Sequence, residues 1–262
     1  MAEINTPSQE KTRPAKTGRR KRRLWIAATT AVAAVAASLV AFGTASADDN
    51  PQGIDVSAHQ GAVDWGAVAG SGKQFAMIKA TEGTGYISGS FGDQYVGSYN
   101  AGLIRGAYHF ALPDASSGAD QANYFADHGG AWSKDDHTLP GSLDIEWNPY
   151  GDTCYGKSQG DMVAWIHDFV NTYKNRTGRD AIIYTAASWW NQCTGGSGDF
   201  AATNPLWVAH YGVNSPAIPG GFSVYTFWQF TSTGSVPGVG GNCDVSTFNG
   251  SHDRLLALAN GT

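Results

Sequence analysis

The sequence has few cysteines, few prolines and few charged residues, and these shortages exclude several classes of protein. Three cysteines among 262 residues allow at most one disulfide within the chain. Ten prolines, and 34 glycines without a fixed period, exclude a collagen-like chain or a simple linker. Charged residues make up 15% and hydrophobic residues 42%, which excludes a disordered chain. Aromatic residues, in contrast, are abundant: nine Trp, eleven Tyr and eleven Phe.

Positive charge is scarce beyond residue 47. Residues 1–47 contain eight of the 17 basic groups and two of the 22 acidic groups, so residues 48–262 carry nine basic and 20 acidic groups, a net charge of −11. Such a surface repels nucleic acid and anionic lipid, because phosphate binding depends on Lys and Arg. We therefore expect no nucleic acid as a partner, and no membrane once the N-terminal segment is removed.

The N-terminal segment has the order of a secretory signal peptide. A basic cluster at residues 19–23 precedes an apolar stretch at 24–42, and Ala-Ser-Ala follows at 45–47. A transmembrane anchor is the alternative, because the apolar stretch is about long enough to span a bilayer. The stretch is rich in Ala and only weakly apolar, which favours a signal peptide over residues 1–47, exported by the general or the twin-arginine route. We expect cleavage after Ala47, which leaves one secreted domain of residues 48–262.

Export would permit a disulfide to form. Cys154 and Cys193 lie in segments rich in Gly, Asn and Thr that we interpret as loops, and we expect these two cysteines to pair. Cys243 stands beside a strand-like stretch and would then be a buried free thiol. The sequence alone also allows the other two pairings.

Short β-branched runs alternate with helical stretches through residues 48–262. The strongest helix is 158–177, where apolar residues recur at helical spacing, Ser158 and Asp161 form a capping pattern and Gly178 follows the end. This alternation predicts a parallel sheet, open or closed, and we favour an irregular single-domain β/α (TIM-like) barrel with reduced helices in the C-terminal part. The expected strands are 53–57, 75–80, 104–111, 141–146, 181–185, 206–211 and 225–230, and the other expected helices are 68–70, 91–101, 119–128 and 253–259.

The most informative stretch is residues 141–147, Gly-Ser-Leu-Asp-Ile-Glu-Trp. In a strand alternate residues share a face, so Asp144 and Glu146 point to one side while Leu143 and Ile145 point to the other. Burial and mutual repulsion of two carboxyl groups raise the pKa of at least one of them, which suits a general acid near neutral pH. The alternative is an exposed strand end with two solvated acids.

Further acids accompany strand-like runs. Residues 48–262 contain 18 Asp but only two Glu, Glu82 and Glu146. Glu82 stands where the run 75–80 enters a Gly-rich loop, the place at which barrel enzymes carry active-site residues. Asp55 and Asp244 lie inside apolar runs near the two ends of this region. Any one Asp could instead cap a turn, but acids on several strand ends together predict a catalytic site.

Aromatic and polar residues lie near these acids in the sequence. Aromatic faces beside carboxylates suit sugar rings, whose C–H faces stack while their hydroxyls find polar partners. For any single aromatic residue, core packing is the more common role. The predicted substrate-binding residues, besides Glu82, are His59, Tyr108, His109, Phe110, Trp147, Tyr184, Trp207, Tyr211, Trp228 and Gln229.

Metal-dependent hydrolysis and a serine nucleophile lack their sequence signatures. The seven histidines are scattered and include no H-x-x-x-H pair, so no metal site is predicted. A G-x-S-x-G nucleophile elbow is absent. We therefore expect neither a metal ion nor another cofactor.

The sequence resembles glycoside hydrolase family 25, the secreted muramidases often called Chalaropsis-type lysozymes. The resemblance covers nearly all of residues 48–262 in the same order. It implies a β/α-barrel that hydrolyses the β-1,4 bond between N-acetylmuramic acid and N-acetylglucosamine in bacterial peptidoglycan. It rests on the segments 53–61 (G-I-D-V-S-A-H-Q-G), 75–83 (F-A-M-I-K-A-T-E-G), 106–110 (G-A-Y-H-F), 144–146 (D-I-E) and 228–230 (W-Q-F).

The resemblance also implies roles for the acids. Glu146, the Glu of the D-x-E motif, would donate a proton to the leaving oxygen, and Asp144 would orient the reacting sugar and stabilise its charge. Asp55 and Asp244 would complete the acidic site, while Glu82 and the aromatic residues shape the groove. Enzymes with such a pair can use the N-acetyl oxygen of the substrate as nucleophile, and we favour this retaining route.

Two other functions stay open at the level of the sequence. One is a barrel protein that binds cell-wall glycan without turnover, although a binder has no physical need to bury Asp55, Asp144, Glu146 and Asp244. The other is a related enzyme of different specificity, such as a chitinase. We expect a secreted, extracellular monomer whose partner is the glycan strand of peptidoglycan.

Overall fold

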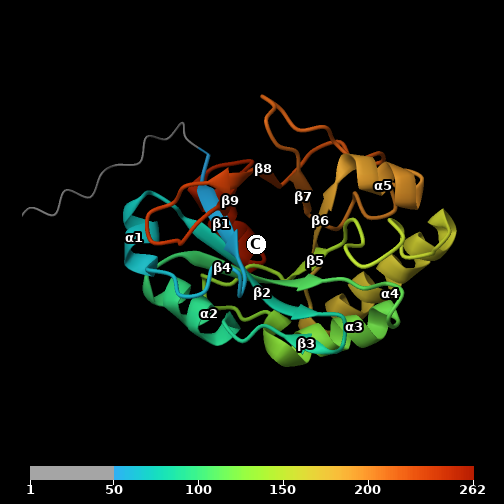
Figure 1. Cartoon of the computed structure of the whole chain (residues 1–262), viewed down its shortest axis with the longest axis horizontal. Coiled ribbons are helices and arrows are strands. Elements are labelled where there is room, and N and C mark those ends of the chain that lie inside the picture. Colours follow the sequence, from blue (N-terminus) through green and yellow to red (C-terminus); the bar gives the residue numbers. More distant parts are fainter. Residues whose placement is uncertain (1–49) are drawn as a thin grey trace, which may run out of the picture. The chain divides into compact units, whose positions relative to one another are not determined.

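Eight strands close into a barrel in the computed structural model, which describes residues 50–262 (Figure 1). The predicted signal peptide lies outside the described residues. In chain order the elements are β1 Gln52–Val56, α1 Trp65–Gly70, β2 Phe75–Glu82, β3 Tyr86–Ile87, α2 Phe91–Asn100, β4 Ile104–Phe110, α3 Gly118–Phe125, the π-helical turn η1 Ala126–Gly130, β5 Ser142–Asp144, α4 Gln159–Thr177, β6 Ile182–Ala186, α5 Ala187–Thr194, β7 Leu206–Ala209, β8 Phe227–Gly234, β9 Cys243–Phe248 and α6 His252–Asn260.

The predicted TIM-like barrel is confirmed, but its sheet is not wholly parallel. Seven strands run parallel in the order β1, β2, β4, β5, β6, β7 and β8, and β9 closes the ring by pairing antiparallel with both β8 and β1. The expectation of a parallel sheet is therefore wrong at β9. Only residues 235–242 separate β8 from β9, and a parallel return needs a crossover of a dozen residues or more.

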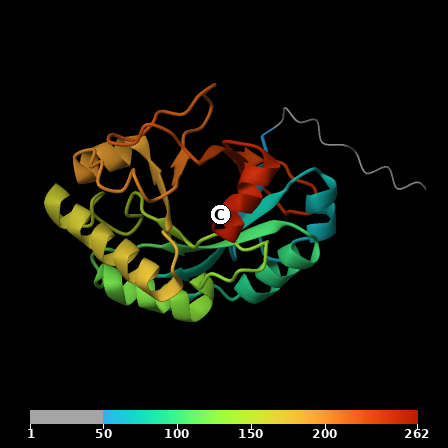
Figure 2. The ribbon, with the colours of Figure 1, turned by 180° about the vertical axis from the view of Figure 1, so that it is seen from behind.

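Side chains alternate between the inside and the outside of the barrel except at bulges. In β4, Ile104 packs in an interior cluster together with Phe75 of β2, whereas Ala107 packs in a second cluster with the helices outside. The inner cluster continues to α6, whose Leu255 and Ala259 belong to it. Figure 2 shows α6 crossing the barrel at the end where the parallel strands begin. This end is therefore filled by apolar side chains, and the opposite end is left for a site.

Helix α4 forms as predicted. The Ser158 side chain accepts a hydrogen bond from the backbone N–H of Asp161, and Gly178 ends the helix with a φ of 74°. Its buried stripe, which includes Phe169 and Tyr173, covers the outer face of the sheet. Within residues 50–262, no helix has both the length and the apolar character that crossing a bilayer requires.

Helix α5 is not among the helices that the sequence predicts. The structure also puts Cys193 in this helix rather than in a loop. Aromatic residues have modest helix propensity, but Trp189 and Trp190 of α5 are both fully buried. Tertiary packing therefore decides this helix. No helix separates β7 from β8 or β8 from β9, as the prediction of reduced helices in the C-terminal part requires.

Candidate active site

Four carboxyl groups meet at the end of the barrel where the parallel strands finish. Asp55 comes from β1, Asp144 from the last position of β5, Glu146 from two residues further along the chain, and Asp244 from the start of β9. They lie around a cavity of about 320 Å³. Its lining residues are Asp55, Lys79, Tyr108, Phe110, Asp144, Glu146, Tyr184, Trp207, Tyr211, Gln229, Ser232 and Asp244.

The alternation of the strands explains why the acids converge. Leu143 and Ile145 pack outward in the cluster beneath the helices, so Asp144 and Glu146 face inward. Asp55 of β1 lies directly opposite Asp244 in the antiparallel pair β1–β9. Facing residues of such a pair share one face of the sheet, which places two like charges side by side. The arrangement costs stability, so it indicates a chemical rather than a structural role.

Burial raises the pKa of all four acids, and repulsion between them adds to the shift at three. Asp55 and Asp144 are only 6% and 7% exposed, and burial raises the pKa of each well above its ordinary value. Repulsion from Asp244 adds to the shift at Asp55, and repulsion from Glu146 adds to it at Asp144. Burial raises the pKa of Asp244, and a hydrogen bond with Asp55 opposes the shift. Burial, followed by the charge of Asp244, raises the pKa of Glu146 to about 7, so this carboxyl group can hold or release a proton near neutral pH.

A network of hydrogen bonds orients Asp55. Gln229 donates from Nε2 to Oδ2 of Asp55 over 2.8 Å, and its Oε1 accepts from the hydroxyls of Tyr184 and Tyr211 over 2.8 and 2.6 Å. The two tyrosines thus fix the amide so that its N–H group faces the carboxylate. In contrast, Oδ1 of Asp144 is buried without a partner, which leaves an acceptor free for a group of the substrate.

Lys79 and Ser232 line the cavity and were not predicted. Lys79 is the one cationic side chain among the lining residues, and it forms an ion pair with Glu82 and lies 4.9 Å from the ring centre of Phe110. Its position in the run 75–80, three residues before Glu82, was the available signal. We find no comparable sequence signal for Ser232.

Comparison with known proteins decides the family. Residues 54–239 match the model of the family described as Glycosyl hydrolases family 25. The chain belongs to this family. It is 58% identical over 211 residues to Lysozyme M1 of Streptomyces globisporus, with 80% of this chain and 72% of that protein covered. It is 44% identical over 214 residues to the N,O-diacetylmuramidase of Chalaropsis sp, with 80% and 99% covered.

Solved structures agree with this assignment. The crystal structure of the bacterial lysozyme from Streptomyces coelicolor matches with a TM-score of 0.81 at 57% identity, and the match covers 82% of this chain and 99% of that one. The structure of a family 25 lysozyme from Aspergillus fumigatus matches with a TM-score of 0.77 at 50% identity, covering 81% and 100%. The protein is thus a glycoside hydrolase of family 25, and its fold is the family's barrel.

Five of the predicted substrate-binding residues of this family 25 hydrolase do not line the cavity. His59 is exposed in the turn after β1, and Trp147 is 41% exposed beyond β5. Trp228 follows Phe227, an inner-cluster residue, so it faces outward, where its Nε1 donates to the carbonyl of His210. The remaining two are Glu82 and His109.

His109 and Glu82 lie close to the cavity without lining it. His109 is fully buried outside the barrel, because it alternates with Tyr108 and Phe110, which face the cavity. Its ring stacks on Phe169 of α4. Burial raises the pKa of Glu82, but hydrogen bonds from Lys79 and from the Tyr150 hydroxyl lower it further than burial raises it. Glu82 therefore stays ionised beside Lys79.

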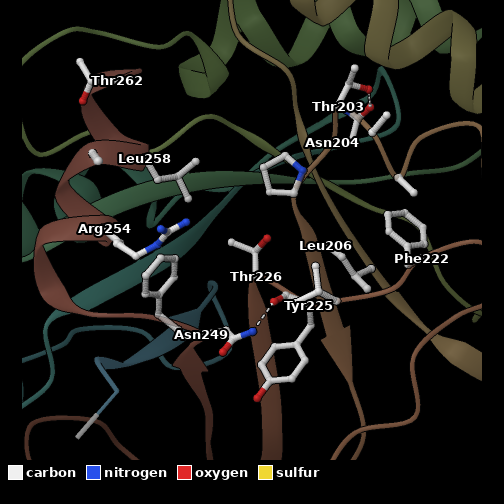
Figure 3. Close-up of a pocket in the computed structure, with 16 residues that line it drawn as sticks. Thr203, Asn204, Leu206, Phe222, Tyr225, Thr226, Asn249, Arg254, Leu258 and Thr262 are labelled. Carbon is white, nitrogen blue, oxygen red and sulfur yellow. Dashed lines mark hydrogen bonds between the residues drawn. The ribbon is translucent and has the colours of Figure 1, made fainter. Parts of the chain in front are cut away.

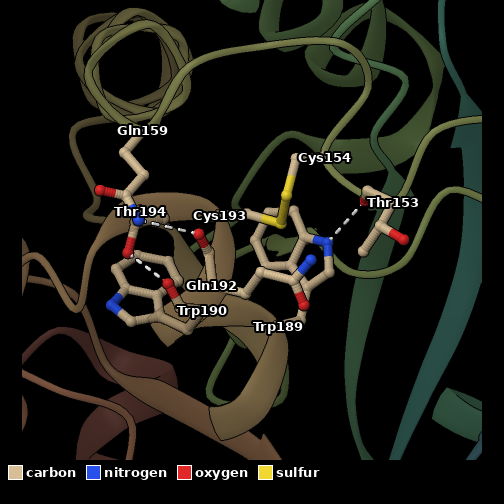
Figure 4. Close-up of a disulfide and its surroundings, with 8 residues drawn as sticks. All are labelled: Thr153, Cys154, Gln159, Trp189, Trp190, Gln192, Cys193 and Thr194. Atoms are coloured by element: carbon tan, nitrogen blue, oxygen red, sulfur yellow. Dashed lines mark hydrogen bonds between the residues drawn. A yellow bond between two sulfur atoms is a disulfide. The ribbon is translucent and has the colours of Figure 1, made fainter.

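A disulfide fixes the loop that follows Glu146. Cys154 and Cys193 are bonded, as predicted, and Cys243 is a buried free thiol. The bond ties the β5–α4 loop to α5, and Trp189 of α5 donates from Nε1 to the carbonyl of Thr153 over 2.9 Å (Figure 4). Two adjacent anchors therefore hold the loop only a few residues from the proposed acid.

The same loop contains a pattern that suggests phosphate binding and that the structure explains otherwise. Residues 151–158 read Gly-Asp-Thr-Cys-Tyr-Gly-Lys-Ser, the spacing of a phosphate loop before a helix. In the structure the Ser158 hydroxyl donates to Asp161, and Asp161 occupies the first turn of α4. A carboxylate already stands where an anion would bind, so the match is coincidental.

A second cavity, of about 510 Å³, lies at the opposite end of the barrel (Figure 3). Arg254, Tyr225 and Asn249 are among its lining residues, and none of the lining side chains is a carboxylate. It therefore lacks the groups that glycoside hydrolysis needs. Within residues 50–262, no three His, Cys, Asp or Glu side chains are arranged to hold a metal ion.

Proposed function

We propose that the protein is a secreted muramidase, which hydrolyses the β-1,4 bond between N-acetylmuramic acid and N-acetylglucosamine in bacterial peptidoglycan. The names of the relatives support this substrate, since they include a lysozyme and an N,O-diacetylmuramidase. The observation that carries the proposal is the carboxyl group of Glu146, whose pKa of about 7 lets it act as an acid in a cavity that it shares with three other carboxyl groups.

Glu146 is the proposed general acid. It donates its proton to the glycosidic oxygen as the bond from this oxygen to the anomeric carbon breaks. The acetamido carbonyl oxygen of the same sugar forms a bond to the anomeric carbon and gives a cyclic oxazolinium intermediate. Water then attacks this carbon, the carboxylate of Glu146 takes up its proton and the ring opens, so configuration is retained.

Asp144 is the proposed partner of the acetamido group. Its buried Oδ1 has no hydrogen-bond partner, so it can accept from the acetamido N–H and stabilise the positive charge of the intermediate. Asp55, held by Gln229, and Asp244 complete the acidic site. Their charges keep the pKa values of Glu146 and Asp144 high and favour a cationic transition state.

The proposed sugar contacts are the inward aromatic residues of the cavity, Tyr108, Phe110, Tyr184, Trp207 and Tyr211. Trp207 is held in place by a hydrogen bond from its Nε1 to Ser246. Fixed aromatic faces suit the C–H faces of a sugar ring. Because the surface is anionic and walls are anionic too, affinity should arise in this groove and weaken little with added salt.

Secretion is part of the proposal. The order of residues 1–47 and the Cys154–Cys193 disulfide support export to an oxidising compartment, with cleavage after Ala47. N-terminal sequencing of protein recovered from culture medium tests this. A start at Asp48 is expected, and an uncleaved chain retained in membranes would contradict it.

The test of the reaction is mass analysis of fragments released from purified walls, with chitin assayed in parallel. Fragments with N-acetylmuramic acid at the new reducing end, and little release from chitin, are expected. Reducing N-acetylglucosamine ends would contradict the bond assignment, and preferred release from chitin would indicate a chitinase. Binding to walls without any release would indicate a non-catalytic wall-binding protein.

A further inference from the structure

Strand β2 contains a bulge at the point where it reaches the cavity. Lys79 pairs with Tyr108 of β4, but the next pair is Thr81 with His109, so Ala80 is an extra residue. Ala80 packs outward under the helices, and Thr81 also points outward, to His109. The bulge shifts the alternation by one residue.

The bulge determines which face of β2 Glu82 occupies. With regular alternation Glu82 would be on the face opposite Lys79, in the layer beneath the helices. With the bulge, Lys79 and Glu82 lie on the same side and form their ion pair. Lys79 precedes the bulge and lines the cavity among four carboxyl groups by regular alternation, and Glu82, brought to its side by the bulge, holds its ammonium group there. The charge of Lys79 lowers the pKa values of Asp144 and Glu146.

A buried chain of hydrogen bonds holds the bulge from behind. Thr81 Oγ1 lies 2.8 Å from Nδ1 of His109, and Nε2 of His109 lies 2.9 Å from Oε1 of Gln121 in α3. The backbone of Leu112 fixes the amide of Gln121, since its N–H donates to Oε1 and its carbonyl accepts from Nε2.

These contacts determine the tautomer of the imidazole. Oε1 of Gln121 can only accept, so Nε2 of His109 carries the proton and Nδ1 accepts from the Thr81 hydroxyl. Burial lowers the pKa of His109 to about 4, although the hydrogen bond to Gln121 opposes this shift. The ring is therefore neutral near neutral pH. Thr81 and His109 are both fully buried, so no water can replace either partner without rearrangement.

We propose that His109 is a positioning residue, which acts through Thr81 to hold the β2 bulge. The bulge keeps Glu82 paired with Lys79, and this ion pair keeps Lys79 beside the catalytic carboxyl groups. His109 itself contacts no substrate. The role explains why a buried histidine stands at a position that apolar packing between β4 and α4 could fill.

The test of the link is Thr81→Val, which replaces the hydroxyl by a methyl group and leaves Nδ1 of His109 unpaired. Without the link Glu82 no longer holds Lys79 beside the carboxyl groups, so the pKa of Glu146 rises and the alkaline limb of the profile of kcat against pH moves to higher pH. We expect kcat to fall about tenfold with a smaller change in KM. Thr81→Ser keeps the hydroxyl and should restore both the rate and the profile.

Thr185→Val is the matched control. Thr185 is a fully buried residue of β6 whose hydroxyl has no hydrogen-bond partner, so the same change there should alter neither kcat nor the profile. If Thr81→Val behaves like Thr185→Val, or if Thr81→Ser behaves like Thr81→Val, the proposal is wrong.

A second measurement does not depend on activity. Nitrogen NMR of the wild-type enzyme should show His109 as the neutral Nε2–H tautomer that does not titrate between pH 5 and 8, and Thr81→Val should perturb its Nδ1 signal. An Nδ1–H tautomer, or titration in that range, would overturn the proposal. The activity readout rests on the proposed function, so a wild type without muramidase activity would contradict that function, while the NMR result would still decide the role of His109.

Discussion

Gln229 donates a hydrogen bond from Nε2 to Oδ2 of Asp55, and the two residues come from strands at opposite ends of the chain, β8 and β1. The bond lowers the pKa of Asp55, against the larger effect of burial and the repulsion from Asp244. Among residues 50–262, no other side-chain amide donates a hydrogen bond to any of the four acids. This bond therefore orients Asp55 in the site.

Gln229→Leu should therefore lower activity. Without the amide the pKa of Asp55 rises further, and the hydroxyls of Tyr184 and Tyr211 lose their common acceptor. We expect kcat to fall by about one order of magnitude or more, as is usual when a buried group loses a hydrogen bond to a charge. Steady-state kinetics on solubilised peptidoglycan measure this. Gln52→Leu, on the exposed end of β1, is the matched control and should behave like the wild type.

Glu146→Gln removes the transferable proton with little change in shape. Activity should fall at least about a hundredfold, the usual contribution of general acid catalysis. Reducing-end release measures the loss, and circular dichroism checks that the fold is intact. Nearly full turnover by this variant would contradict the assignment of Glu146.

Asp144→Asn tests the second carboxyl group. The asparagine keeps an oxygen but loses the charge that would stabilise the intermediate, so a large loss in kcat with an intact fold is expected. Kinetics over a range of substrate concentrations separate kcat from KM. An unchanged kcat with a raised KM would mean that Asp144 only binds the substrate.

The pH dependence should follow Glu146, because the proton donor must be protonated to act. Activity should decline as pH rises through about 7, the pKa of Glu146. Burial is the main cause of the raised value and the charge of Asp244 is the next, so Asp244→Asn should lower this pKa and move the alkaline limb to lower pH. Profiles of kcat against pH measure the limb, and Asp253→Asn in α6, at the other end of the barrel, should leave it in place.

The same carboxyl group should make stability depend on pH. The pKa of Glu146 is raised from 4.5 to about 7 on folding, so its favourable contribution is complete below the unfolded value and is lost as pH rises through the folded one. Glu146→Gln should thus increase the free energy of unfolding relative to the wild type, by on the order of 3 kcal/mol more at pH 8 than at pH 4. Urea unfolding at both pH values measures the difference. An equal effect at both would contradict the raised pKa of Glu146.

How far the sequence predicts the site depends on the alternation of each strand. Asp144 and Glu146 are two positions apart in the chain, so the sequence alone establishes that they share a face, which in the structure is the inner one. His109 and Trp228 stand beside residues that face the cavity, but their own parity turns them outward. Sequence patterns locate the end of a strand well. A shift of one residue in the alternation, however, turns a side chain from the cavity into the core beneath the helices.

Helix α4, the succession of strands and the acids at their ends can be predicted from the amino-acid sequence, because local periodicity and residue chemistry carry that information. Three features follow from the folded barrel alone: β9 runs antiparallel and sets Asp244 against Asp55, α5 forms around two buried tryptophans, and a bulge in β2 brings Glu82 to the side of Lys79. These features depend on contacts between residues far apart in the chain. Such contacts exist only once the barrel has closed and burial has fixed which side chains meet.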